Sequence, residues 1–420
     1  VFARFAVIDP HLYMVFQVGK SFGDIKTFKW LLSEDRLTYL GNRSDHEYGY
    51  PPQHEFEWIR THRELHRFGL HPHISIEDRL FVETIGGDLT IKIEDNTATG
   101  EGIYAEPVEQ QDQTLDDAEI FYASLGNLIL LKIRPYQEKK FRYIVYNEKL
   151  RQARRVDAIE DACVLLPDGQ GIIFSSGYYL QTGEFKTFET AFTGIKFDRR
   201  IQAPNGEDHL YVFYHPESGN YLLLSYNVIE QRVATPLVCG GCSFFDNGEL
   251  AIFKEEAEAQ KHHVIQIWQT PFTAASLNPA VKKDSFLYKI GNPELVAAMA
   301  ECHEVLGLLG KDDSYANLYF DLVKKTGDIL DAYFWLDREE AGNLKTALVE
   351  IRQAATSAVD EFDKVVRIRR ATAERVRQTV EQARALISNI PYTRLNEIDL
   401  FVHNLAELRK VRGELISLKD

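Results

Sequence analysis

Short apolar runs, each introduced by a turn signal, recur at a regular spacing in the middle of this sequence. The anchors are Gly126, Gly169, Gly206 and Gly248, and the runs LILLKIR, GIIFSS, HLYVFY and ELAIFKE follow them. Glycine beside Asn, Asp or Pro marks a turn, and the apolar runs are rich in β-branched and aromatic residues, as strands are. The spacing between successive anchors is nearly constant. A strand-rich repeat of about 40 residues, as here, is typical of the blades of a β-propeller.

The same period extends toward the N-terminus. Gly87 lies one period before Gly126, and Pro10 lies close to two periods before Gly87. The pattern therefore predicts a mainly β region over residues 1–275, a six- or seven-bladed β-propeller. We expect the run FAVID at residues 5–9 to pair with the last strands, because such pairing removes an exposed sheet edge.

Two polar stretches interrupt this pattern. Residues 51–73 are rich in histidine and aromatic residues, and FEWIRTHRELHRF within them suggests two or three helical turns in an insertion between blades or at a decorated blade edge. Residues 94–118 are acidic and contain glycine and proline, which predicts a long surface loop. Loops on a rigid scaffold often carry function, so Glu101 and Tyr104 are candidates for binding a partner.

Residues 276–420 change to a helical pattern. Asn292-Pro293 and Gly310 bound one predicted helix, and SYANLYFDLVKKTGDILDAYFWL predicts a second. From Leu344 onward, apolar residues step by three and four for about 45 residues until Pro391, and a further helix follows. This length and period predict a long helix that begins a coiled coil.

Composition and charge narrow the class of protein. The formal net charge is −15, and nearly all of the acidic excess lies before residue 281, which disfavours a broad nucleic-acid surface there. Four cysteines in 420 residues do not make a disulfide framework, so we expect a cytoplasmic location, with membrane association only through partners. No apolar run is long enough to span a bilayer. The chain begins at Val1 and ends on a helical pattern, so we expect it to be a fragment of a longer protein.

Histidines are concentrated between residues 54 and 73. His62 and His66 are four positions apart, and on a helix they would share a face, as metal ligands do; His71 and His73 follow. The spacing fixes no third ligand, so these four are candidates for a metal site, and hydrogen-bonded structural histidines are the alternative. We expect no metal in this chain.

Three other motifs carry weaker signals. Cys239-Gly-Gly-Cys242 has the CxxC spacing but precedes a strand pattern, which favours two small residues before a strand over a redox or zinc site. Gly19-Lys20 and Gly310-Lys311 lack the first glycine of a Walker A motif, since those positions hold Met14 and Val305. The basic run that contains Arg367, Arg370 and Arg377 on the long helix is either a solvated face or a contact with an acidic partner, lipid or nucleic acid.

Long stretches of the chain resemble a known family. Residues 51–108, 113–150, 289–306 (KIGNPELVAAMAECHEVL) and 313–325 (DSYANLYFDLVKK) are similar to the bacterial AAA+ proteins described as DNA repair ATPases. In that family such a region precedes a long coiled coil and a C-terminal AAA+ module. The resemblance implies that this chain is the non-catalytic N-terminal part of such a protein. It also implies ATP and magnesium in the AAA+ module and a homo-oligomer formed through that ring and the coiled coil.

Three functions remain open on the sequence. The first is an interaction or adaptor region, in which the propeller binds a protein partner and the helices couple it to the chain's own C-terminal AAA+ module. The second is a nucleic-acid-binding arm that uses the basic face of the long helix. The third is a metal-dependent enzyme at the histidine cluster.

Overall fold

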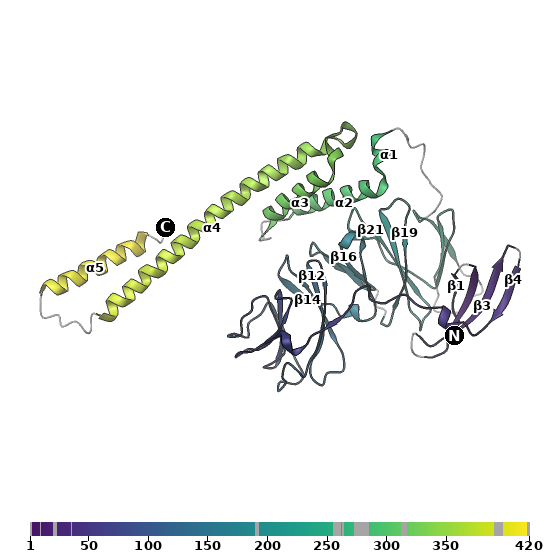
Figure 1. Ribbon diagram of the computed structural model, residues 1–420, viewed down its shortest axis with the longest axis horizontal. Coiled ribbons are helices and arrows are strands. Elements are labelled where there is room, and N and C mark those ends of the chain that lie inside the picture. The colour runs from purple at the N-terminus through teal and green to yellow at the C-terminus, as the bar shows by residue number, and fades with distance from the viewer. Residues whose placement is uncertain are drawn as a thin grey trace. The chain divides into compact units, whose positions relative to one another are not determined.

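The computed structural model describes residues 2–8, 10–19, 23–34, 36–189, 193–254, 262, 264–272, 285–311, 317–389 and 398–417 (Figure 1). In the last two helices the backbone alone is described at 362–374, 386, 388–389, 398–401 and 414–417. The chain divides into two compact units, Val1–His303 and Glu304–Asp420. The first is mainly β and the second is helical, as the sequence predicts.

Strands in the described part of the first unit form six antiparallel sheets. The first sheet contains β1 (Phe2–Ile8), β2 (His11–Gln17), β3 (Ile25–Ser33) and β4 (Arg36–Gly41). The second contains β6 (His66–Arg67), β7 (His73–Ile76), β8 (Leu80–Glu83), β9 (Asp88–Lys92) and β10 (Tyr104–Pro107). The third contains β5 (Ile59–Arg60), β11 (Glu119–Leu125), β12 (Leu128–Arg134), β13 (Arg142–Asn147) and β14 (Gln152–Arg155).

The other three sheets follow in chain order. The fourth contains β15 (Cys163–Leu165), β16 (Gly171–Phe174), β17 (Gly177–Leu180) and β18 (Phe185–Thr187). The fifth contains β19 (Lys196–Gln202), β20 (Asp208–Tyr214), β21 (Tyr221–Asn227), β22 (Arg232–Val233) and β23 (Leu237–Cys239). The sixth contains β24 (Gly241–Phe244), β25 (Glu249–Phe253) and β26 (Ile265–Gln269).

The turn glycines explain why the sequence repeats. Gly126, Gly169, Gly206 and Gly248 all have positive φ and lie shortly before β12, β16, β20 and β25. Each glycine lies between two consecutive, paired strands of one sheet. Glycine adopts positive φ without strain, so the period in the sequence is the recurrence of one turn in successive sheets.

Apolar seams join five of the sheets face to face. Along β12, Ile129 and Leu131 belong to a cluster shared with β7–β9, whereas Leu128 and Leu130 belong to a cluster shared with β15–β17. Alternate residues of a strand point to opposite faces, so each middle sheet is buried on both sides. Further clusters join the fourth sheet to the fifth and the fifth to the sixth.

The predicted closure by the N-terminal run is wrong for the described residues. β1 pairs with β2, and β26 pairs with β25, so no ladder joins the first sheet to the sixth. The first sheet instead contacts the fifth, where Arg4 of β1 and Asp198 of β19 form a buried ion pair. The β1–β2 ladder ends with Ile8 opposite His11, and strands so near in sequence pair more readily than distant ones.

Residues 48–60 form a strap across the sheets. Of the two alternatives predicted for 51–73, the described strands fit the decorated edge, because β5 and β6 are edge strands of the third and second sheets. The Gln53 side-chain amide accepts from Phe197 N at 2.8 Å, and its backbone O accepts from Cys163 N at 2.8 Å. Glu55 accepts from Leu165 N at 2.8 Å, and β5 then pairs with β11. The strap thus contacts β11, β15 and β19, which belong to three different sheets. These strands come much later in the chain, so no local sequence pattern reveals the contacts.

Two local predictions in these polar stretches are also wrong. FEWIRTHRELHRF contains no α-helix, but β5, the short 3₁₀ helix η2 (Arg63–Leu65) and β6. Residues 94–118 are not one long loop, because β10 lies within them and pairs with β9. Strand pairing supplies the backbone hydrogen bonds that a short isolated helix could not retain in water.

Helices α1 (Phe286–Ile290) and α2 (Asn292–Leu309) begin after the sixth sheet. Val296 and Ala300 of α2 are part of the apolar cluster of the fourth and fifth sheets. The boundary between the compact units therefore lies at 303/304, later than the predicted 275/276.

The second unit contains α3 (Leu318–Ala332), α4 (Leu344–Asn389) and α5 (Ile398–Ser417). The predicted long helix is confirmed by α4, which has 46 residues. α4 packs against α3 and α5, with Ile329 of α3 fully buried. The coiled coil stays a prediction. Further 3₁₀ helices in the chain are η1 (Asp45–Glu47), η3 (Asp157–Glu160), η4 (Pro167–Gly169), η5 (Phe334–Asp337) and η6 (Glu339–Ala341).

No helix in the described part of the chain is long and apolar enough to cross a bilayer.

Candidate functional site

The β6–β10 sheet has one apolar face and one polar face, both buried. Ile74, Val82 and Ile91 point into the seam with β11–β13. The alternate residues on the other face include Ser75, Glu83 and Lys92, which are also buried. Buried charges are retained in proteins when they are paired, so this polar face depends on its internal contacts.

An ion pair on the polar face fixes two loops. Lys92 Nζ lies 2.6 Å from Glu83 Oε2, and both side chains are 3% exposed. Lys92 also donates to Thr99 O at 2.7 Å. His71 Nδ1 lies 3.0 Å from Glu83 Oε1, and His71 N donates to Thr97 O at 2.8 Å. The loop before β7 and the loop after β9 are therefore held on one buried carboxylate.

The predicted histidine cluster is dispersed. His73 pairs with Asp95 at 2.8 Å, whereas His62 is exposed and lies 3.5 Å from Glu64. His66 packs its ring against Phe68, and burial lowers its pKa. The shared helical face that would make His62 and His66 metal ligands does not exist, because this segment is not a helix. Nowhere in the described ranges do three metal-binding side chains meet.

Phe68 and Leu70, called here the apolar pair, lie in the loop between β6 and β7. Both are 80% exposed, the highest exposure of any large apolar residue in the described part of the chain. Gly69 between them lies so close to Thr97 that a Cβ would overlap its side chain. The loop that presents the apolar pair thus packs tightly on a neighbouring loop that Lys92 anchors.

Tyr104 and Glu101, the predicted partner-binding residues, lie on the next segment. Glu101 is exposed. Tyr104 begins β10, is half-buried, and donates from its hydroxyl to Glu106 Oε2 at 2.7 Å. Burial and the neighbouring Glu106 carboxylate raise the pKa of Tyr104. Its hydroxyl is therefore engaged within the protein.

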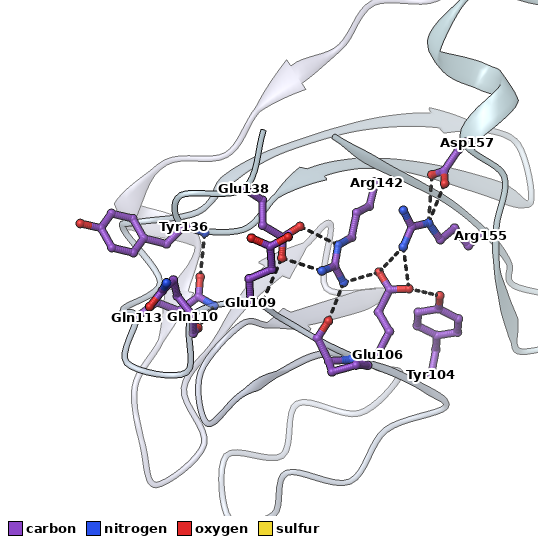
Figure 2. Close-up of polar contacts among 11 residues, drawn as sticks. Tyr104, Glu106, Glu109, Gln110, Gln113, Tyr136, Glu138, Arg142, Arg155 and Asp157 are labelled. Atoms are coloured by element: carbon purple, nitrogen blue, oxygen red, sulfur yellow. Dashed lines mark hydrogen bonds and ion pairs between the residues drawn. The ribbon is translucent and has the colours of Figure 1, made fainter. Parts of the chain in front are cut away.

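Arg142 on β13 fastens β10 to the neighbouring sheet, as Figure 2 shows. Its guanidinium donates to Glu106 Oε1 at 2.7 Å, to Pro107 O at 3.0 Å and to Glu138 Oε1 at 2.6 Å. Arg155 lies 3.2 Å from the other Glu106 oxygen. Burial alone would raise the pKa of Glu106, but the hydrogen bonds from Arg142 and Tyr104 hold it below its ordinary value.

This arginine cluster is suited to fastening the sheets, not to catalysis. Each oxygen of Glu106 and Glu138 accepts at least one hydrogen bond from within the protein. Gln113 Oε1 accepts from Tyr136 N at 3.0 Å (Figure 2), which fixes the far end of the same segment. Residues 104–113 are therefore fastened to the third sheet at both ends.

Residues 63–118, called here the acidic lobe, contain most of the excess charge. They have thirteen acidic and four basic residues, a net charge of −9 out of −15 for the chain. The exposed acidic residues are Glu64, Glu77, Asp78, Asp88, Glu94, Asp95, Glu101, Glu109, Asp112, Asp116 and Asp117. The apolar pair is therefore presented in a strongly negative field.

The basic residues predicted on the long helix lie on α4. Arg367 and Arg370 fall where the backbone alone is described, and Arg377 is exposed. Arg370, Arg377 and Arg384 are seven residues apart in succession, which places them on one face of α4.

In the described residues, neither Gly-Lys pair is seen to open a helix. Gly310-Lys311 follows the C-terminal end of α2, and Gly19 lies between two strands; Lys20 lies outside the described residues. A phosphate-binding loop must open a helix, because the helix N-terminus supplies the amide donors.

Sequence reasoning missed the apolar pair and the Arg142 cluster. Two large apolar residues around a glycine, in a stretch otherwise rich in His and Arg, are a signal that could have found the first. The contact between Arg142 and Glu106 joins two different sheets and had no local signal.

A comparison with known protein families shows which family the chain belongs to. The profile of one family, described as "ATPase involved in DNA repair", matches residues 1–334. The chain belongs to this family. The matched residues include all six sheets and α3, so the family extends through the acidic lobe and into the second compact unit.

No protein with a curated description matches the chain. Among solved structures, an oligogalacturonate lyase in complex with manganese is 12% identical, with 66% of this chain and 77% of that chain covered and a TM-score of 0.19. The S. cerevisiae core factor is 7% identical, with 78% of this chain and 68% of that chain covered and a TM-score of 0.17. Similarities this weak carry no argument about fold or function.

Proposed function

We propose that this chain is a non-catalytic interaction region of an ATPase, and that its acidic lobe binds a basic surface of a partner protein around the apolar pair. The observation that carries the proposal is the 80% exposure of both Phe68 and Leu70 on an anchored loop. In this proposal the six sheets are the blades of a β-propeller, which presents the lobe rigidly.

Burial of the apolar pair would supply the affinity. A large apolar side chain contributes roughly 1.5–3 kcal/mol when it moves from water into an apolar pocket. Gly69 against Thr97 and the Glu83–Lys92 ion pair hold the loop in place before binding. A preorganised loop loses little conformational entropy on association, so more of that free energy appears as affinity.

Charge selects the class of partner. A net charge of −9 around the apolar pair attracts a pocket surrounded by Lys and Arg. The same charge repels nucleic acid and anionic lipid, so both are poor ligands for this lobe. A basic protein surface with an apolar pocket satisfies both features.

The remaining parts of the function rest on the family. We assign ATP hydrolysis, with its ATP and magnesium, to a C-terminal AAA+ module. The lack of a Walker A sequence in this chain supports that assignment. The helical unit would couple the bound partner to that module. Its long helix would also support a homo-oligomer in the cytoplasm.

A capture experiment with matched variants tests the proposal. The bait is the full chain, either wild type or with Phe68→Ser and Leu70→Ser together, and the lysate is treated with nuclease. The control is Phe334→Ser, since Phe334 is 72% exposed and lies in the second unit. We expect the wild type and the control to retain the same basic protein. The double variant should lose roughly tenfold or more of it. Equal retention by all three baits would contradict the proposal.

The family description gives one further candidate, a nucleic-acid-binding arm on α4. The arginine face of α4 that includes Arg377 favours it. This function predicts that duplex DNA binds the chain with an affinity that falls steeply with salt. Reversal of charge at Arg367, Arg370 and Arg377 would then abolish binding, and a variant of the apolar pair would not. The absence of such binding would exclude the arm.

A further inference from the structure

The CxxC sequence lies where the fifth and sixth sheets meet. Cys239 ends β23, which pairs with β21, and Cys242 lies in β24, which pairs with β25. Both cysteines belong to the apolar seam with Leu223 and Leu250. The seam therefore brings two reduced thiols together at the point where the chain passes from one sheet to the next.

The intervening turn is compact. Gly240 N donates to Phe253 O at 2.9 Å, and a Cβ on Gly241 would overlap the Phe253 ring. A larger residue at 241 would therefore require the partly exposed Phe253 ring to move. The turn leaves the Cys239 and Cys242 side chains in the same apolar seam, where the two thiols influence each other.

The two thiols differ in environment. Cys239 is buried, whereas Cys242 is partly exposed. The neighbouring Cys239 thiol lowers the pKa of Cys242, and Arg199 acts in the same direction, whereas burial and Asp198 oppose the shift. The neighbouring Cys242 thiol, together with burial, raises the pKa of Cys239. Thiolates are the reactive form of cysteine, so reactivity is concentrated on the accessible sulfur.

We infer that Cys239 and Cys242 are an oxidation site for hydroperoxides, with Cys242 as the attacking sulfur and Cys239 as the resolving one. Cys242 attacks a peroxide oxygen, so that an S–O bond forms, the O–O bond breaks and water or an alcohol leaves. Cys239 then attacks the sulfur of the sulfenic acid, an S–S bond forms, and the S–O bond breaks to release water. The dithiol loses two electrons, and the peroxide accepts them.

The other two cysteines provide internal controls. Cys163 is buried and Cys302 is partly exposed, and burial raises the pKa of each. Cys302 and Cys242 are both partly exposed, but no neighbouring thiol affects the pKa of Cys302. Cys302 is therefore the matched control for Cys242. Cys239 and Cys242 are the only cysteines between Arg232 and Lys254, so trypsin leaves both on one peptide.

The test is a hydrogen peroxide titration of the full chain, followed by alkylation in denaturant and tryptic mass analysis. We expect peptide 233–254 to lose both alkylation sites together, at a peroxide concentration roughly tenfold below that needed to oxidise Cys302. Dithiothreitol should restore both sites. Oxidation of Cys302 at the same or a lower concentration, or alkylation of both seam cysteines throughout, would overturn the inference.

Two variants assign the roles. Cys239→Ser should leave Cys242 as a sulfenic acid that dimedone traps, whereas Cys242→Ser should leave Cys239 unmodified by dimedone. A dimedone adduct on Cys239 would overturn the assignment. Cys239 is buried, so circular dichroism must first show that the variants fold; if one does not, the wild-type titration still decides the inference.

Discussion

Arg142 is a buried cation between two largely buried carboxylates, and it contributes to stability. Its side chain is 9% exposed, as is that of Glu138, and Glu106 is nearly as buried. We expect Arg142→Met to lower the free energy of unfolding by about 3 kcal/mol, because it leaves the largely buried Glu138 carboxylate without its cation and leaves Glu106 with Arg155 alone. Urea denaturation measures the change. Arg63→Met is the control, since the Arg63–Asp116 pair is exposed and its loss should change little. Equal effects of the two substitutions would contradict this account of the cluster.

Glu106 makes stability depend on pH through the same contacts. Its pKa is lower in the folded protein than its ordinary value of 4.5. A depressed carboxyl pKa adds stability that is present above the ordinary pKa and is lost as pH falls through the folded pKa. Glu106→Gln should therefore be less stable than wild type near neutral pH, with a difference that shrinks below about pH 4.5. Urea midpoints across this range measure the effect, and a constant difference would refute it.

At the residue scale, the sequence predicted which residues turn the chain but not which charges meet. The turn glycines were found because positive φ has a local signature. Glu106 and Arg142 were not found, because ion pairs between sheets depend on which strands become neighbours. His62 and His66 were predicted to share one face of a helix, but this segment does not form that helix. Glu101 and Tyr104 do lie in the acidic lobe, one exposed and the other engaged with Glu106.

At the scale of elements, helices with a clear period were predictable and the polar segments were not. α2 and α4 have the predicted bounds within a few residues, because the 3.6-residue period and the flanking Asn, Pro and Gly residues are local signals. Residues 48–60 resisted prediction, because their contacts are with β11, β15 and β19, which come much later in the chain.

The packing of α3 gives a prediction for the helical unit. Ile329 is fully buried in α3, whereas Ile387 of α4 is 59% exposed. We expect Ile329→Ala to destabilise this unit by about 2–5 kcal/mol through lost apolar burial and a residual cavity. The same change at Ile387 should alter stability by no more than about 0.5 kcal/mol. Thermal unfolding followed by circular dichroism at 222 nm measures both, and similar values would mean that α3 does not pack as described.

At the scale of the whole molecule, the account depends on the acidic lobe as a presented surface. The sequence predicted a β-rich region followed by helices, and the structure has that order with six sheets in its described part. The pairing of β1 was not predictable from the repeat, since a hairpin with β2 satisfies the same apolar pattern. The charge of −9 in residues 63–118 could be read from the sequence, but its coincidence with the exposed apolar pair could not.

The most direct test of the central claim is photo-cross-linking from the apolar pair in living cells. A photoreactive phenylalanine analogue replaces Leu70 in one chain and Phe334, the matched exposed position, in another. The account predicts that position 70 cross-links a protein with a basic surface, that Phe68→Ser in the same chain removes this product, and that position 334 never yields it. The same products from both positions, or a product from position 70 that nuclease removes, would contradict it.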